Sequence, residues 1–152
     1  MKTYIFKTSL LYSSPLIAPR GPEISREIEI PENVSLYKLA KAIVSAYNFN
    51  FDHCFGFFSK IDAWKYFDSP RKYELFTDLI EEGEPLEPTG AGSVKKTKIS
   101  EVWQSIGDKM MFLFDYGDNW HFLVELINFG KKELKQKYPR ILKKVRKAPK
   151  QY

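Results

Sequence analysis

The sequence contains a single cysteine, Cys54, among its 152 residues. A lone cysteine excludes an internal disulfide bond and any zinc site built from several cysteines. The glycine patterns of phosphate-binding and dinucleotide-binding loops are also absent. No apolar run approaches the roughly 20 residues that a membrane-spanning helix needs. The first residues lack the apolar stretch of a signal peptide, so we expect a cytoplasmic protein. We also expect the protein to work without a cofactor.

Aromatic residues, by contrast, are abundant, with 12 Phe, 9 Tyr and 3 Trp. Apolar residues make up 43% of the sequence and charged residues 28%, which is the balance of a globular protein. A chain of this length is expected to form one domain of ordinary size, with many of its aromatic side chains in the core.

The net charge of +5 is distributed unevenly along the chain. Residues 131–152 hold ten basic residues and one acid, whereas the preceding 130 residues hold 14 basic and 18 acidic residues. We therefore predict a single domain over residues 1–130 and a basic C-terminal segment over 131–152 that is part of this domain or docked on it. Such a segment can bind phosphate-rich partners, or it can fold against the acidic run from Glu74 to Glu87. Its candidate nucleic-acid contacts are Lys131, Lys132, Arg140, Lys143, Lys144, Arg146 and Lys147.

Alternating apolar and polar residues predict two strands in the first part of the chain, over residues 3–12 and 24–30. Between them, residues 13–22 contain three prolines and a glycine, which predicts a loop. Apolar residues then recur at helical spacing, so we expect one main amphipathic helix over about residues 35–47, ended by Asn48 or Asn50.

The rest of the chain predicts shorter elements. We expect a short strand over residues 53–59, a strand followed by a loop over 73–80, and a short helix over 98–106. The strongest local signal is a hairpin of two strands, over 110–116 and 120–127, whose turn is expected to use Gly117 for a positive φ angle. Together these elements predict an α+β fold, with an antiparallel sheet of about four to five strands and the main helix on one face.

Candidate functional residues are concentrated around this hairpin. They are Asp115, Tyr116, Asp118, Trp120, His121 and Glu125, together with Asp52 and His53 from an earlier part of the chain. Carboxylates and imidazoles are the groups that a hydrolytic divalent-metal site uses. However, His121 and Glu125 fall on the strand face opposite Trp120, and Asp residues in turns commonly accept backbone hydrogen bonds. We therefore predict no metal site and assign no catalytic residue.

The hairpin sequence Phe-Asp-Tyr-Gly-Asp-x-Trp-x-x-x-Val-Glu, from Phe114 to Glu125, resembles the plasmid pRiA4b open-reading-frame-three-like family, some members of which are associated with transposons. Residues 30–39, 51–57 and 138–152 resemble further segments of this family in the same order. The resemblance implies an α+β fold and carries no established activity. The chain departs from the family by having Phe55 where many members have a second histidine, and His121 directly after the tryptophan rather than two residues after it. Both departures weaken the case for a metal site shared with the family.

Two classes of function remain. The first is a non-enzymatic module that binds nucleic acid or a protein partner in a mobile-element or regulatory context, without a membrane partner. The alternative is a metal-dependent hydrolase or nuclease centred on residues 114–125, so whether the protein is an enzyme stays open. The alternative requires the acids and histidines to converge on one cleft, which the sequence alone does not decide.

Overall fold

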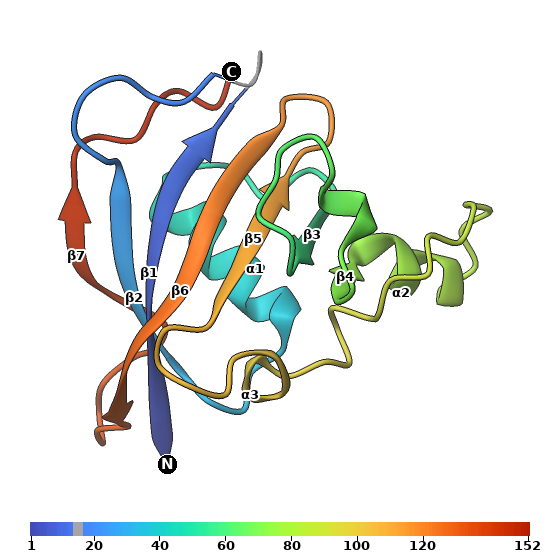
Figure 1. Ribbon diagram of the computed structural model, residues 1–152. Helices are drawn as coiled ribbons and strands as arrows, with labels where there is room; N and C mark the ends of the chain where they lie inside the picture. The colour runs from blue at the N-terminus through green and yellow to red at the C-terminus, as the bar shows by residue number, and fades with distance from the viewer. Residues whose placement is uncertain (14–16) are drawn as a thin grey trace.

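A seven-stranded antiparallel sheet forms the centre of the protein in the computed structural model, which describes residues 1–13 and 17–152. The strands are β1 (Lys2–Tyr12), β2 (Ser25–Pro31), β3 (Phe55–Phe58), β4 (Lys72–Glu74), β5 (Lys109–Phe114), β6 (Trp120–Lys131) and β7 (Arg140–Val145). Their order in the sheet is β4-β3-β5-β6-β1-β2-β7, so β1 lies in the interior of the sheet between β6 and β2 (Figure 1). The predicted loop over 13–22 includes residues 14–16, which lie outside the described residues.

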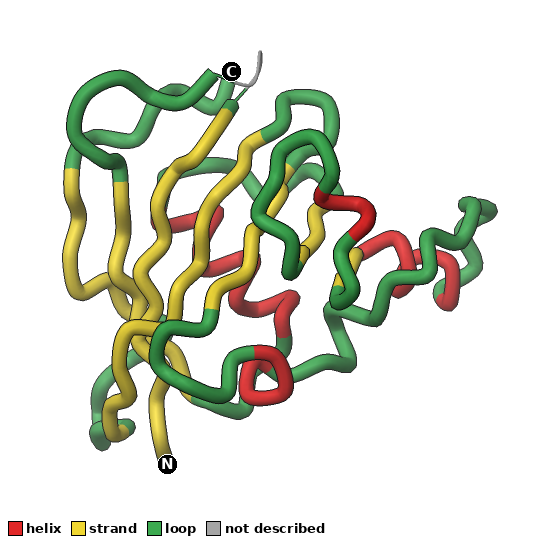
Figure 2. The backbone as a smooth tube through the Cα atoms, in the orientation of Figure 1, coloured by secondary structure: helices red, strands yellow, loops and turns green. Residues whose placement is uncertain are grey.

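The expected α+β class with four to five strands is wrong, because strands make up most of the regular structure (Figure 2). In the described residues the α-helices are α1 (Leu36–Ala46), α2 (Leu75–Glu81) and α3 (Ile99–Val102). The sequence did not predict β7, because its residues are exposed or half-buried and show no apolar alternation. Its backbone pairing with β2 makes it a strand, and the sequence pattern of one segment does not report its pairing with another.

Helix α1 covers one face of the sheet with its apolar stripe, as the spacing predicted. Leu36, Leu39 and Ile43 are fully buried against aromatic side chains from four strands. These aromatic residues are Phe6, Phe57, Phe112 and Phe122. The helix begins after Ser35, whose hydroxyl oxygen accepts a hydrogen bond from a first-turn backbone N–H at 3.2 Å. It ends before Asn48, which adopts the predicted left-handed conformation with φ 60°.

The other face of the sheet is covered in part by residues 59–71, which follow β3. Tyr66 from this segment packs against Phe58 and His121, with ring centroids 4.8 and 6.0 Å apart, and is half-buried. Trp64, in the same segment, is 73% exposed. His121 therefore lies under a covering segment, on the face away from α1.

The segment after β4 forms a helix where the sequence predicted a loop. Asp78 in α2 is buried, and its carboxylate accepts hydrogen bonds from the Ser93 hydroxyl and from the backbone N–H of Val94 at 2.9 Å. These contacts tie α2 to a distant segment. Tertiary contacts of this kind stabilise a helix whose local sequence is ambiguous.

The helix predicted over residues 98–106 is limited to the four residues of α3. The carboxylate of Asp108 accepts hydrogen bonds from the backbone N–H groups of Gln104 and Ser105 at 2.9 and 3.0 Å, which stabilises a turn after the helix. Gly107 within this turn has a φ angle of 99°. Across residues 1–13 and 17–152, no helix has both the length and the apolar character needed to cross a membrane.

Residues 131–152 extend the sheet and then run past the C-terminal end of α1. After β7, the guanidinium of Arg146 donates hydrogen bonds to the carbonyl oxygens of Arg20 and Pro22. Further on, the side chain of Gln151 accepts from the backbone N–H of Asn50 at 2.7 Å and donates to its carbonyl oxygen at 3.1 Å. The C-terminal segment is thus attached to the sheet and to the region that follows α1.

The acidic run from Glu74 to Glu87 lies at the opposite edge of the sheet from β7, where α2 follows β4 (Figure 1). Two of its carboxylates, on Glu81 and Glu82, form ion pairs with Lys96 and Lys95 at 2.7 and 2.9 Å. The alternative in which this run masks the basic segment is therefore wrong. The acidic and basic parts of the chain occupy opposite edges of one sheet.

Candidate functional site

The turn between β5 and β6 is organised by Asp115, whose carboxylate is buried. Its Oδ1 atom accepts hydrogen bonds from the backbone N–H groups of Gly117 at 3.0 Å and Asp118 at 3.2 Å. Asp115 and Asn119 have positive φ angles of 67° and 57°, a conformation that Asp and Asn tolerate better than most residues. The expectation that Gly117 supplies a positive φ angle is wrong, because Asp115 and Asn119 take that role.

Asp52 and His53, which precede β3, lie beside this turn. His53 Nδ1 is 2.7 Å from Asp52 Oδ1, and His53 Nε2 is 3.5 Å from Asp115 Oδ2. The backbone explains the approach, because the N–H of Asp115 donates to the carbonyl oxygen of Cys54 at 2.9 Å. The structure thus brings three of the predicted site residues together, with the imidazole between two carboxylates.

The C-terminal end of the chain adds a phenol to this cluster. The hydroxyl of Tyr152 donates a hydrogen bond to Asp52 Oδ2 at 2.6 Å and lies 3.4 Å from His53 Nδ1. This hydrogen bond, with a smaller contribution from His53, lowers the pKa of Asp52. The same bond raises the pKa of Tyr152 to about 12, so the proton stays on the phenol at neutral pH. Sequence reasoning did not select Tyr152, because contacts between residues 100 positions apart leave no local signal.

Tyr116 and Cys54 belong to a second polar group that includes Glu74. The hydroxyl of Tyr116 donates a hydrogen bond to the buried carboxylate of Glu74. Burial, followed by the charge of Glu74, raises the pKa of Tyr116, so that this phenol remains protonated. Burial also raises the pKa of the Cys54 thiol, which disfavours the reactive thiolate. The sequence offered no reason to select Glu74, which reaches the group from β4.

The remaining hairpin candidates do not join the His53 cluster. His121 is fully buried on the sheet face away from α1, where its Nδ1 contacts the carbonyl oxygen of Asn119 at 2.8 Å. Glu125 lies further along β6, between Lys7 of β1 and Lys109 of β5.

Trp120 packs on the α1 side against Phe49, with ring centroids 4.8 Å apart. Its Nε1 atom, like Nε2 of His121, is buried without a hydrogen-bond partner among the described residues. These two nitrogens belong to opposite faces of the sheet, so they do not form one polar site.

The arrangement offers proton transfer more readily than metal binding. The imidazole of His53 contacts Asp52 through Nδ1 and lies 3.5 Å from Asp115 through Nε2, a geometry in which it can pass a proton from one side to the other, and its side chain is 37% exposed. A hydrolytic metal site needs several oxygen or nitrogen ligands that converge on one point. Within the part of the chain that the structure describes, no three His, Cys, Asp or Glu side chains are arranged to hold a metal ion.

The basic candidates fall into two groups. Arg140 and Arg146 hold the segment in place, Arg140 through an ion pair with Glu29 at 2.7 Å and Arg146 through backbone carbonyl oxygens. The exposed lysines lie at the end of β6, in the β6–β7 loop, on β7 and after it. They are Lys131, Lys132, Lys143, Lys144 and Lys147.

Sequence reasoning missed two lysines on α1 that lie near the β6–β7 loop. Lys38 and Lys41 are exposed and line a cleft that Lys132 lines from the loop. A signal was available, because the two lysines are three positions apart and therefore share one helix face.

The chain matches the family described as plasmid pRiA4b ORF-3-like protein over residues 16–151. The chain belongs to this family. The resemblance noted in the hairpin sequence is confirmed, and it extends over most of the protein.

Among solved structures, this pRiA4b ORF-3-like protein is similar to the crystal structure of a protein of unknown function, MM3350 from Methanosarcina mazei Go1. The two share 23% sequence identity with a TM-score of 0.68, over 97% of this chain and 71% of that chain. This similarity shows a common fold. No curated protein matches the sequence.

Proposed function

We propose that this protein is a non-enzymatic module that binds nucleic acid through the basic edge, defined as the exposed lysines Lys143, Lys144 and Lys147. The observation that carries the proposal is the charge at this edge of the sheet. In residues 131–152, the one ion pair among the described residues joins Arg140 to Glu29. Lys143 lies opposite Glu27 of β2, but no ion pair joins the two among the described residues. Exposed cations of this kind attract phosphates and release counterions when they bind them.

The position of β7 favours a polyanion as the ligand. The other candidate ligand at a sheet edge is a peptide that would add a strand to the sheet. β7 is an edge strand, and Lys143 and Lys144 lie within it. Lysines on an edge strand disfavour pairing with another strand. The basic edge also lies across the sheet from the acidic α2, so that the molecule is polarised and one edge is directed toward a negatively charged partner.

Binding of this kind depends on the phosphate backbone and reads little sequence. The longest helix in the described residues, α1, lies with its apolar face on the sheet, so it is not free to enter a major groove. We therefore expect weak affinity that falls steeply with salt and varies little between sequences.

The alternative, a metal-dependent hydrolase or nuclease, is favoured only by the approach of His53 to Asp52 and Asp115. His121 and Glu125, which this alternative requires, lie elsewhere. Calorimetric titration with Mn²⁺, Zn²⁺ and Mg²⁺ tests it. A stoichiometric site that disappears in Asp115→Asn would support the hydrolase over the binding module.

Fluorescence anisotropy with a labelled DNA duplex, at low and at physiological salt, tests the binding module. The double variant K143Q/K144Q is expected to bind about tenfold more weakly at low salt, with a slope of log K against log salt reduced by about 1.8. The matched control K60Q/K65Q removes two exposed lysines from a segment away from β7 and should bind like the unmodified protein. Equal losses in the two variants, or no binding by the unmodified protein at low salt, would overturn the proposal.

A further inference from the structure

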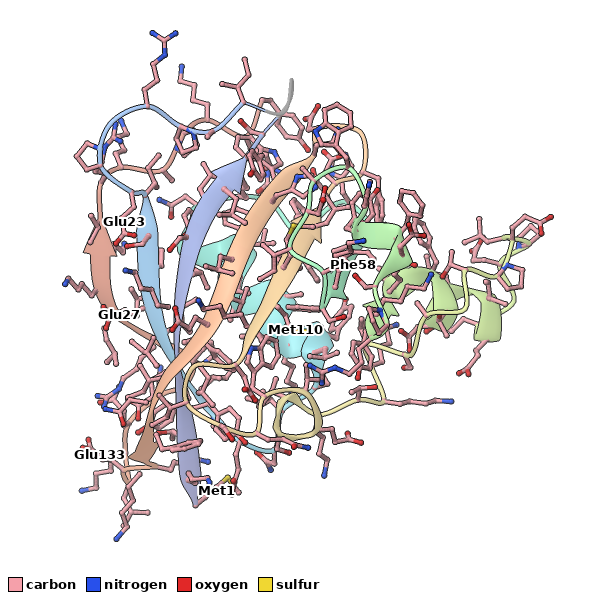
Figure 3. All side chains as sticks on the ribbon, in the orientation of Figure 1. Met1, Glu23, Glu27, Phe58, Met110 and Glu133 are labelled. Atoms are coloured by element: carbon pink, nitrogen blue, oxygen red, sulfur yellow. The ribbon has the colours of Figure 1, made fainter. Side chains whose placement is uncertain are left out.

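A cleft of about 730 Å³ separates α1 from the β6–β7 loop. One wall is the polar face of α1, the opposite wall is the loop over residues 132–139, and the end of β2 contributes Ile30 and Pro31. Met1 and Glu133 lie at one end of the sheet (Figure 3), and Lys132, which begins the loop, directly precedes Glu133. A volume of this size fits an extended ligand of a few chemical groups, because small-molecule sites span about 300–1,000 Å³.

The charge in the cleft has one sign. Lys38 and Lys41 line it from α1 and Lys132 lines it from the loop, and no acidic residue is among the described residues that line it. None of the three lysines forms an ion pair within the described residues. Like charges three positions apart on a helix repel each other, so the free protein bears an electrostatic cost that a bound anion would relieve.

Aromatic and amide side chains accompany these cations. Tyr37 and Tyr138 line the two walls and are half-buried, and Gln136 lines the cleft from the loop wall. The ring of Tyr37 packs edge-to-face against Phe51 at a centroid distance of 5.3 Å and lies under the Lys95 ammonium at 5.3 Å. The ring of Tyr138 lies under the Arg140 guanidinium at 5.5 Å, so a base would stack on the other face of each ring. Lysines that contact a backbone, together with aromatic rings that stack on bases, are the combination by which proteins bind single-stranded nucleic acid.

The loop wall is fixed before any ligand arrives. The backbone N–H of Lys132 donates to the carbonyl oxygen of Met1 at 2.8 Å, and the N–H of Glu133 donates to the hydroxyl of Tyr138 at 3.0 Å. At the other end of the loop, Arg140 is paired with the buried carboxylate of Glu29. A wall held at both ends loses little conformational entropy on binding, which favours affinity.

We infer that this cleft binds a single strand of nucleic acid, with its phosphates on Lys38, Lys41 and Lys132 and its bases against Tyr37 and Tyr138. The inference rests on the proposed nucleic-acid binding and specifies where a single strand is held. A duplex is too wide to enter a cleft of this volume, so we expect duplex DNA to bind at the basic edge. The cleft and the basic edge then distinguish the two forms of nucleic acid.

The test compares a labelled oligothymidylate with a labelled duplex of equal charge, by fluorescence anisotropy at low and physiological salt. K38Q/K41Q is expected to bind the single strand about tenfold more weakly, with the salt slope reduced by about 1.4, and to bind the duplex as before. K143Q/K144Q carries the same change of charge on the basic edge and is expected to weaken duplex binding more. A thermal melt of each variant checks that the fold is retained.

The outcomes separate the two claims. If the unmodified protein binds the duplex but K38Q/K41Q binds the single strand like K60Q/K65Q, the cleft assignment is wrong and the basic edge stands. If K38Q/K41Q weakens both ligands equally, the cleft does not select a single strand and the inference fails. Oligoglutamate of the same charge is then added as a competitor of the labelled single strand. If it displaces the labelled strand as effectively as unlabelled oligothymidylate does, the cleft binds acidic peptides instead and the inference is wrong.

Discussion

The buried guanidinium of Arg26 donates a hydrogen bond from Nε to the carbonyl oxygen of Ala46 at 3.0 Å. Ala46 is the last residue of α1, where the helix dipole places partial negative charge on carbonyl groups without helical partners. Nη1 of the same side chain donates to the carbonyl oxygen of Arg146 at 2.9 Å. One side chain on β2 therefore connects the end of α1 to the segment after β7.

Replacing Arg26 by methionine is expected to lower the free energy of unfolding by about 2–3 kcal/mol. Methionine retains much of the side-chain volume but leaves the carbonyl oxygens of Ala46 and Arg146 without their donor, and a buried unpaired acceptor costs about 1–3 kcal/mol. Urea unfolding followed by circular dichroism measures the loss. A variant as stable as the unmodified protein would show that water replaces the guanidinium at little cost.

Alkaline pH is expected to destabilise the protein through Tyr47. Burial raises the pKa of this phenol to about 12, against smaller opposing effects of the Thr8 hydroxyl and the Arg26 charge. Between pH 10 and 12 only the unfolded chain releases the proton, so the free energy of unfolding decreases by about 2–3 kcal/mol as the pH rises. Unfolding in urea at pH 9 and pH 11 should show about half of this decrease, roughly 1.4 kcal/mol, because pH 11 lies midway between the two pKa values, and the decrease should be smaller in Tyr47→Phe. An equal decrease in that variant would assign the effect to other tyrosines.

Acidic pH is expected to destabilise the protein through His121. Burial lowers the pKa of this imidazole below its ordinary value of 6.5, against a smaller opposing effect of the Asn119 carbonyl. The unfolded chain therefore takes up a proton first as the pH falls below about 6.5, and the free energy of unfolding decreases. Asn can replace the hydrogen bond from Nδ1 without titrating, so His121→Asn should show a shallower decrease between pH 7 and pH 5. An unchanged slope in that variant would contradict the assignment.

The hairpin turn is expected to tolerate a side chain at residue 117 better than its sequence suggests. Gly117 does not have a positive φ angle, and an added Cβ would meet only Asp115 Oδ1, at 3.3 Å. The Asp115 carboxylate must shift by a few tenths of an ångström to admit this Cβ, so Gly117→Ala should lower the melting temperature slightly. Asn119→Ala should cost about 1 kcal/mol, because alanine lacks the tolerance of asparagine for φ 57°. A larger loss for Gly117→Ala than for Asn119→Ala would contradict this description of the turn.

The sequence predicted the elements whose pattern is local. The apolar stripe of α1 and the alternation along Trp120–Ile127 report which side chains are buried, and the structure agrees with both. β7 was missed because its pairing with β2 is a property of two segments. The same reason applies to the site, since Asp52 and His53 meet Asp115 and Tyr152 only after the sheet has formed.

The order of the strands also affects how the molecule is made. β1 is synthesised more than 100 residues before the end of β6, yet β6 is one of its two neighbours in the sheet, with Lys2 opposite Lys131. The hairpin of β1 with β2 can form early, but the second edge of β1 stays unpaired until residues 120–131 have been synthesised. Pairings between such distant segments slow folding and leave strand edges open to aggregation. The nascent chain is therefore expected to depend most on chaperones in the interval between the synthesis of β1 and the synthesis of β6.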